Sequence, residues 1–228
     1  MELAKNHLDV GLFTNSLEPM LEFWQQQVGL PFEEVLATGG GSQQHRHAFG
    51  GGVLKINHVR DPLPEAPPSG YRELLLAREG IVEPREMTDP DGNRMKLVPP
   101  GFEGVTSTGV VVAVSSLANA RAYYGRALGW EQRSEATFAC GETVLFLRHD
   151  ATITTQADSM RAPGCRYLTV QVRDCDAEYN TILQRGGSSG VPPRTMGAVA
   201  RFGFVRDPDG NWLEVSQRAS LTGPLPPN

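Results

Sequence analysis

The pentapeptide DPDGN occurs at residues 89–93 and again at residues 207–211, each time followed by a short stretch of alternating polar and apolar residues. Proline fixes φ and glycine supplies a positive φ, so the pattern is typical of a tight turn that leads into a strand. Each copy therefore predicts a β-hairpin. A repeated hairpin indicates a repeated structural module, which we sought upstream of both turns.

The repeat extends well upstream of the two turns. Two dipeptides, Phe23-Trp24 and Val28-Gly29, recur 100 residues later as Tyr123-Tyr124 and Leu128-Gly129. The two turns themselves are 118 residues apart, so the second half carries about eighteen additional residues between these landmarks.

The local patterns predict four βαβββ modules. The first has an apolar strand over 8–13, a helix from Ser16 to Val28 and three strands between residues 32 and 58. In the second module only residues 79–84 separate a strand from the hairpin, which leaves no room for a helix. In the last module a helix from Asp174 to about Gly186 accounts for the additional residues.

The fold expected is therefore α+β, with tandem βαβββ modules that form two cupped mixed sheets, the second module lacking its helix. We expect residues 1–101 to form a first half with modules one and two. Residues 102–228 are expected to form a second half with modules three and four.

The composition excludes several classes of protein. A net charge of −5 argues against a general surface for binding nucleic acid. The sequence contains no run of 18 apolar residues, so we expect no membrane span. The first residues lack the apolar segment of a signal peptide, so a cytoplasmic location is expected. Cys140, Cys165 and Cys175 form neither a CxxC pair nor a metal spacing and are expected to be free, buried thiols.

Four segments carry a family resemblance: VGLFTNSLEPMLEFWQQQVGL, VVVAVSSLANARAYYGRALGW, LTVQVRDCDAEYNTILQRGG and FGFVRDPDGNWLEVSQ. Together they resemble the vicinal oxygen chelate superfamily of glyoxalases, bleomycin-resistance proteins and extradiol dioxygenases, over almost the whole chain. The resemblance implies paired modules that form a cupped sheet around a cavity. It also implies a divalent metal, held by first and last strands of the modules, that chelates two vicinal oxygens of the substrate.

The resemblance assigns the ligand positions residue by residue. In the four modules, the first-strand position falls on Asp9, Tyr71 or Arg72, Gly109 and Tyr167, and the last-strand carboxylate position on Lys55, Lys96, Phe146 and Glu214. Glycine has no ligating side chain, a neutral phenol is a poor ligand for Fe(II), and a lysine repels a metal. The pattern of two histidines and one carboxylate is therefore broken. We expect no cofactor, and a divalent Fe, Mn, Zn or Ni ion is the alternative.

Glu214 and Tyr167 are the candidate catalytic residues. Glu214 can act as a general base or as a lone ligand, unless it is simply a carboxylate on an exposed strand. Tyr167 can donate a hydrogen bond to a substrate oxygen, unless it only fills space. The candidate substrate contacts are Asp9, Lys55, Lys96 and Phe146, of which the three charged residues can instead form a structural ion pair.

Were a metal present, its expected ligands are His7, His45, His47 and Glu214. His45 and His47 are two residues apart and share one face of a strand. The neighbouring strand carries His58. The alternative is that these histidines hold no ion.

The way in which the modules pair decides which candidate site residues lie in the same cavity. Sequential pairing joins modules one with two and three with four, whereas pairing one with four brings Asp9, Tyr167 and Glu214 into one cavity. The truncated second module exposes Leu74 and Leu76 unless the other half or a second subunit covers them, so a homodimer is one expectation.

The function expected is glyoxalase-like or dioxygenase-like, namely an enzyme on an oxygenated organic substrate whose metal site is degenerate. The alternative is a metal-free protein that binds and sequesters a small molecule, as bleomycin-resistance proteins do. The expected partner is a small molecule, not a nucleic acid or a membrane.

Overall fold

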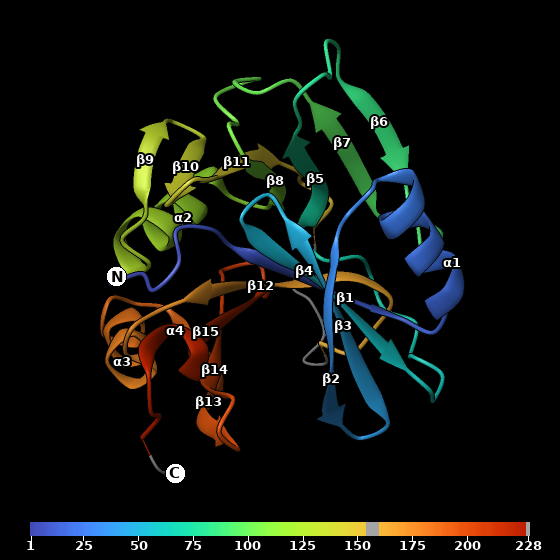
Figure 1. Cartoon of the computed structure of the whole chain (residues 1–228). Coiled ribbons are helices and arrows are strands. Elements are labelled where there is room, and N and C mark those ends of the chain that lie inside the picture. The colour runs from blue at the N-terminus through green and yellow to red at the C-terminus, as the bar shows by residue number, and fades with distance from the viewer. Residues whose placement is uncertain (154–159, 227–228) are drawn as a thin grey trace.

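The computed structural model describes residues 1–153 and 160–226, and it contains two curled mixed sheets (Figure 1). The eight-stranded sheet has the order β13-β14-β15-β12-β1-β4-β3-β2 and the seven-stranded sheet the order β6-β7-β5-β8-β11-β10-β9. The expected α+β class with two cupped mixed sheets is confirmed. Part of the connection between β11 and β12, residues 154–159, lies outside the described residues.

The strands fall at the places that the sequence predicts. Those of the eight-stranded sheet are β1 (Asp9–Thr14), β2 (Phe32–Gly39), β3 (Ser42–Phe49), β4 (Gly52–Val59), β12 (Gly164–Gln171), β13 (Ser188–Met196), β14 (Ala200–Arg206) and β15 (Trp212–Arg218). Those of the seven-stranded sheet are β5 (Tyr71–Ala77), β6 (Arg85–Thr88), β7 (Arg94–Val98), β8 (Thr108–Val114), β9 (Glu131–Ser134), β10 (Thr137–Cys140) and β11 (Thr143–His149).

The sheets pair module one with module four, and module two with module three. In the first sheet, β1 lies between its own parallel partner β4 and the antiparallel strand β12. In the second sheet, β5 pairs with β8. Sequential pairing is therefore wrong, and residues 1–101 and 102–228 each contribute one module to each sheet. The connection over residues 61–70, which holds four prolines and has no regular structure, leads from β4 in the first sheet to β5 in the second.

The helices follow the predicted pattern with one refinement. The first is α1 (Leu17–Leu21), which continues as one π-helical turn, η1 (Glu22–Gln27), and the third module repeats this with α2 (Leu117–Arg121) and η2 (Ala122–Ala127). No helix lies between β5 and β6, whereas α3 (Cys175–Gln184) lies between β12 and β13, as expected. A short α4 (Ala219–Thr222) follows β15. No helix of the described residues is long and apolar enough to cross a membrane.

The two DPDGN turns form the predicted hairpins, β6–β7 and β14–β15, and they also connect the two sheets. The side-chain oxygen Oδ1 of Asn93 accepts a hydrogen bond from the backbone N–H of Cys165 at the start of β12, over 2.8 Å. In the same way, Oδ1 of Asn211 accepts one from the N–H of Gly70, just before β5, over 2.6 Å. Each turn of modules two and four thus binds the first strand of the other module.

The exposed face expected on the second module is covered within the chain. Leu74 and Leu76 are only 2% and 4% exposed, and they belong to the same core cluster as Phe23 and Trp24 of the first module's helix. Figure 1 shows α1 beside β6 and β7. The helix of module one therefore supplies the cover that module two lacks, and this face needs no second subunit. The three cysteines are free and buried, as expected.

The outer face of β3 buries two histidines against the first helical segment. His47 is fully buried and His45 is nearly so. Gln25 Nε2 lies 2.9 Å from His47 Nε2, while His47 Nδ1 and His45 Nε2 have no hydrogen-bond partner in the described structure. Burial, followed by the proximity of His45, lowers the pKa of His47 to about 4.

We predict that His47 makes the protein sensitive to acid. The folded-state pKa of about 4 lies below the ordinary value of 6.5, so the unfolded state takes up a proton first as the pH falls. The stabilisation is complete above pH 6.5 and is lost between that pH and about pH 4. We expect the free energy of unfolding to fall by about 3 kcal/mol from this group, because the pKa differs by roughly two and a half units and each unit is worth about 1.4 kcal/mol.

Urea unfolding at a series of pH values measures this effect. His47→Gln should flatten the pH dependence, whereas His149→Gln, which changes an exposed histidine, should leave it as in the wild type. An unchanged pH dependence in His47→Gln would show that another group is responsible.

Candidate functional site

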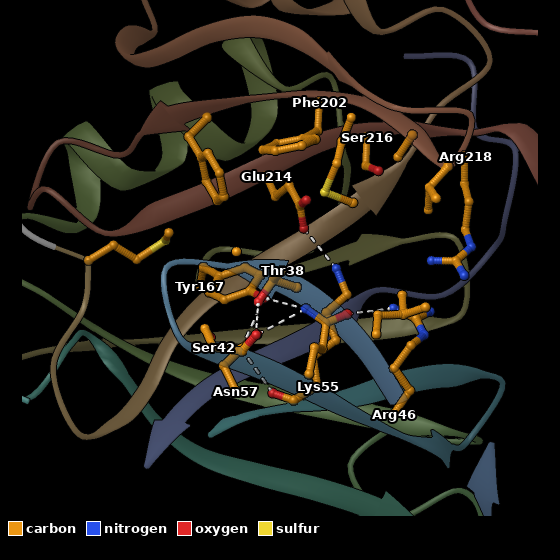
Figure 2. Close-up of a pocket in the computed structure, with 18 of the residues that line it drawn as sticks. Thr38, Ser42, Arg46, Lys55, Asn57, Tyr167, Phe202, Glu214, Ser216 and Arg218 are labelled. Carbon is orange, nitrogen blue, oxygen red and sulfur yellow. Dashed lines mark hydrogen bonds and ion pairs between the residues drawn. The ribbon is translucent and has the colours of Figure 1, made fainter. Parts of the chain in front are cut away.

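The concave face of the eight-stranded sheet, which we call the first cup, encloses a cavity of about 450 Å³. Modules one and four build it, with polar side chains on the sheet floor and aromatic side chains along one wall (Figure 2). Strand alternation explains the lining, since residues two apart on a strand share a face. The floor contains Gln44, Arg46, Lys55, Asn57, Tyr167, Gln171, Glu214, Ser216 and Arg218.

The concave face of the seven-stranded sheet, the second cup, is filled by its own side chains. Phe146 is only 4% exposed and packs in an apolar cluster with Leu75, Val98, Val105 and Val144. Val105 comes from the connection between β7 and β8, which supplies part of the filling. Phe146 therefore does not line the cavity of the first cup, because module three pairs with module two.

Lys96 likewise lies apart from the first cup. Its ammonium is 3.4 Å from a carboxylate oxygen of Glu73 and 3.2 Å from one of Glu86. The substrate contacts expected from the sequence are thus divided, with Asp9 and Lys55 in one cup and Lys96 and Phe146 in the other. A ligand in the first cavity contacts neither of the latter two.

Strand register also resolves the uncertain position in module two. Leu75 lies opposite Lys96, so the first-strand position two residues earlier is Glu73, not Tyr71 or Arg72. An irregularity in the β5–β8 pairing between Tyr71 and Glu73 shifts the register there, and the sequence pattern did not reveal it.

In the first cup, the strand register shows that the assigned positions of module one are equivalent to those of module four. Lys55 lies opposite Gly11 in the β4–β1 pair, and Glu214 lies opposite Thr169 in the β15–β12 pair. Two residues earlier on each first strand stand Asp9 and Tyr167. All four assigned positions of modules one and four therefore meet in one cup.

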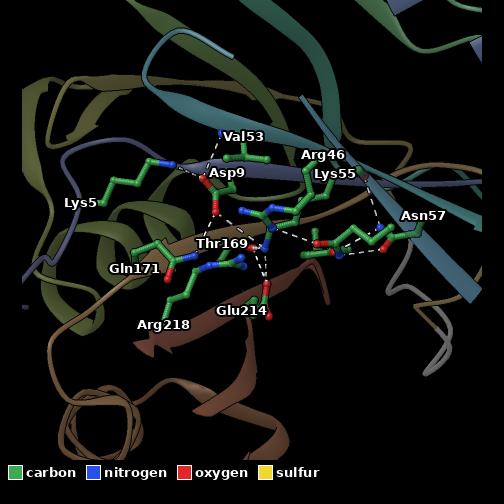
Figure 3. A network of polar contacts seen from close by, with 12 residues as sticks. Lys5, Asp9, Arg46, Val53, Lys55, Asn57, Thr169, Gln171, Glu214 and Arg218 are labelled. Atoms are coloured by element: carbon green, nitrogen blue, oxygen red, sulfur yellow. Dashed lines mark hydrogen bonds and ion pairs between the residues drawn. The ribbon is translucent and has the colours of Figure 1, made fainter. Parts of the chain in front are cut away.

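Figure 3 shows the ammonium of Lys55 beside the carboxylates of Glu214 and Asp9. Its Nζ is 2.7 Å from Glu214 Oε2, 3.8 Å from Asp9 Oδ2 and 5.4 Å from the ring centroid of Tyr167. Thr169 completes the contact, because its hydroxyl accepts a hydrogen bond from Lys55 over 2.7 Å and donates one to Glu214 over 2.5 Å.

Asp9 is the fully buried end of this network. Its carboxylate accepts hydrogen bonds from Lys5 Nζ over 2.8 Å, from the backbone N–H of Val53 over 3.0 Å and from Gln171 Nε2 over 3.0 Å. Burial by itself raises the pKa of Asp9, but the charges of Lys55 and Lys5 outweigh it and hold that pKa below its ordinary value. Asp9 thus does lie between two lysines, but the second is Lys5 and not Lys96.

Tyr167 lies flat against the backbone of β1. A Cβ atom on Gly11 would fall 2.1 Å from the Tyr167 ring, so only glycine permits this approach. The Tyr167 hydroxyl accepts hydrogen bonds from Asn57 Nδ2 over 3.2 Å and Gln44 Nε2 over 3.4 Å. Burial and then the charge of Glu214 raise its pKa, so the phenol keeps its proton and can donate it to a ligand oxygen.

Two arginines that the sequence analysis missed stand at one end of the cavity. Glu34 of the edge strand β2 bridges them, with its Oε1 3.2 Å from Arg46 Nε and 2.7 Å from Arg218 Nη2. A signal was available in the sequence, because Arg218 follows Glu214 at the alternating spacing of one strand face.

The histidines proposed as alternative metal ligands are not brought together with Glu214. His45 and His47 face the opposite side of β3 from Gln44 and Arg46, and His7 Nε2 lies 3.7 Å from Glu142. Among residues 1–153 and 160–226, no group of three or more His, Cys, Asp or Glu side chains is placed to hold a metal ion.

Comparison with known proteins shows what this chain is similar to. Residues 108–215 match the model of the Glyoxalase/Bleomycin resistance protein/Dioxygenase superfamily. No curated protein matches the chain by sequence.

Solved structures match over nearly the full chain. The V278E mutant of glyoxalase I from Zea mays superposes with a TM-score of 0.73 at 14% identity, over 95% of this chain and 92% of that one. A putative dioxygenase from Bacillus subtilis superposes with a TM-score of 0.67 at 12% identity, over 95% and 86% respectively. The family model covers modules three and four, and the structural match covers all four modules. Residues 108–215, just under half of the chain, are thus similar in sequence to this superfamily, and the whole chain has the fold of these solved structures.

Proposed function

We propose that the first cup is a metal-independent active site for a small, oxygenated organic molecule. The observation that carries this proposal is the position of Lys55, whose ammonium lies between Glu214 and Asp9. It supplies a positive charge where the superfamily fold implies a metal.

The residues of the cup do not fit a divalent cation. Lys55 Nζ is already within 2.7 Å of Glu214 Oε2, so a metal bound there would meet a like charge. Tyr167 keeps its phenolic proton, and Asp9 is satisfied by Lys5, Gln171 and a backbone N–H. Neither residue offers the free anionic oxygen that such an ion prefers.

The remaining polar atoms are suited to an oxygenated ligand. Tyr167 has its own O–H to donate, and the buried Gln171 Oε1 has no hydrogen-bond partner in the described structure. Buried polar atoms are normally paired, so these two atoms favour a ligand that both accepts and donates hydrogen bonds.

In the proposed reaction Glu214 is the general base. Its Oε2 accepts hydrogen bonds from Lys55 and Thr169, whereas no described group donates a hydrogen bond to its Oε1. That oxygen takes a proton from the carbon next to a substrate carbonyl. The electron pair of the C–H bond forms a C=C bond to the carbonyl carbon, and the π pair of the C=O bond moves to the oxygen. The resulting enolate oxygen accepts hydrogen bonds from the phenol of Tyr167 and the ammonium of Lys55. Both donors are already in position before the reaction, so they stabilise the developing negative charge.

A second function, binding without chemistry, has one observation in its favour. Lys55, Glu214 and Thr169 satisfy one another without a ligand, beside an aromatic wall of Phe13, Phe202 and Phe204. A protein that only sequesters an apolar compound needs no more than this.

We predict that the protein, purified without chelators, carries less than one Fe, Mn, Zn or Ni ion per chain, because Lys55 occupies the charged centre of the cup. Elemental analysis measures the content. Dialysis against EDTA should leave ligand binding unchanged. One tightly held ion per chain would refute the metal-independent proposal.

We predict that Glu214→Gln abolishes most proton transfer while the fold is retained, since the amide keeps the shape and lacks basicity. Proton NMR in D2O with a panel of 2-oxo acids and hydroxyketones follows loss of the signal from the C–H next to the carbonyl. The variant should exchange about 10²-fold to 10⁴-fold more slowly than the wild type, the usual contribution of a general base.

Glu142→Gln is the matched control, because Glu142 is exposed and lies outside the cup. Exchange by Glu214→Gln at the wild-type rate would remove Glu214 from the mechanism. A compound that binds in the cup but is never exchanged would favour sequestration.

A further inference from the structure

The ion network of the first cup is short of one negative charge. Its ion pairs form two groups of described residues. Lys5 and Lys55 pair with Asp9 and Glu214, whereas Arg46 and Arg218 share the single carboxylate of Glu34. The whole chain, by contrast, carries a net charge of −5. A surplus cation inside a concave site of an acidic protein attracts anions to that site.

The surplus lies at the end of the cavity formed by Arg46 and Arg218. Arg46 is only 5% exposed and donates one hydrogen bond, from Nη1 to Gln44 Oε1 over 2.9 Å. Its Nε is buried and lacks hydrogen-bond geometry to Glu34. Arg218 donates one hydrogen bond, to Glu34. Each guanidinium has five N–H donors, so most donors of both have no partner among the described residues.

The wall near Tyr167 is apolar. Phe204 packs edge-on against Tyr167 at 5.8 Å and against Phe202 at 6.0 Å, between ring centroids, and Phe13 lies 6.1 Å from Tyr167. At the rim, the guanidinium of Arg194 stacks on Phe202 at 5.3 Å, adding a cation near the mouth. The cavity therefore has a cationic end and an aromatic wall.

We infer that the ligand of the first cup is an organic monoanion, with a carboxylate bound by Arg46 and Arg218 and an apolar or aromatic body against Phe202 and Phe204. Arginine binds carboxylates through paired N–H donors, and such charge-assisted hydrogen bonds are stronger than neutral ones. The carboxylate completes the network by adding the fourth anion. This inference rests on the proposed function of the cup as a small-molecule site and specifies its substrate class.

Three probes with the same body and different charge test the inference: 3-phenylpropionate, 3-phenylpropionamide and 3-phenylpropan-1-amine. Isothermal titration calorimetry with the full chain measures their affinities. Because a hydrogen bond to a charged group contributes about 1.5–3 kcal/mol, the carboxylate should bind about 10-fold to 100-fold more tightly than the amide. The amine should bind most weakly, and added salt should weaken only the carboxylate.

Two variants locate the anion site. Arg218→Gln should remove the advantage of the carboxylate over the amide. Glu34→Gln should increase affinity for the carboxylate, because it removes an anion that competes for the same arginines, an effect that mere structural damage does not produce. Arg94→Gln, which changes an exposed arginine of the other sheet, is the matched control and should bind all three probes like the wild type.

Equal affinity for the carboxylate and the amide, or tighter binding of the amine, would overturn the inference while leaving the small-molecule site intact. Unchanged discrimination in Arg218→Gln together with unchanged affinity in Glu34→Gln would also overturn it. Failure of all three probes to bind would count against both the inference and the proposed cavity function.

Discussion

The two sheets are joined by a reciprocal pair of hydrogen bonds between the two DPDGN turns and the strands they face. Asn93 accepts from the start of β12, and Asn211 accepts from the residue before β5. Because these bonds join modules two and four, they hold the two sheets against each other. The pentapeptide therefore does more than reverse the chain. Its last residue supplies a side chain that pairs a buried backbone N–H, which would otherwise be left unsatisfied.

The pairing held in this way brings the first and last modules into one cup, and it places a lysine where the two modules meet. A buried charge is tolerated only when it is paired, and Lys55 has Glu214 and Asp9 around it. The four positions that the resemblance assigns to metal ligands are occupied here by two carboxylates, a lysine and a tyrosine. In the second pair of modules, apolar side chains such as Phe146 pack on the concave face of the sheet. One fold thus carries one open cup and one closed cup.

The sequence was sufficient to predict the modules and the missing helix. These features are local or repeated, and so the alternation of residues and the turn chemistry reveal them. The four positions that meet in the first cup were assigned by the family resemblance. Pairing was not predictable, because β1 can in principle pair with a strand from any other module. That choice decided whether Lys96 and Phe146 share the cavity with Lys55. Glu73 was missed because the β5–β8 pairing shifts register between Tyr71 and Glu73. The arginine pair was missed because Glu34, which pairs with Arg46 across β2 and β3, meets Arg218 from 184 residues away in the chain.

The position of β1 between β4 and β12 has a consequence for how the chain acquires its structure. β1 leaves the ribosome before the other strands of the two sheets, and yet its partner β12 begins at Gly164 and the floor of the cup is complete only with β15. Contacts this distant in sequence form slowly, because a long loop must close before they are made. Until module four has been synthesised, the edge of β1 stays unpaired and Asp9 and Lys55 lack part of their surroundings. The emerging first module therefore passes through a period with an open sheet edge, a state prone to pairing with other chains.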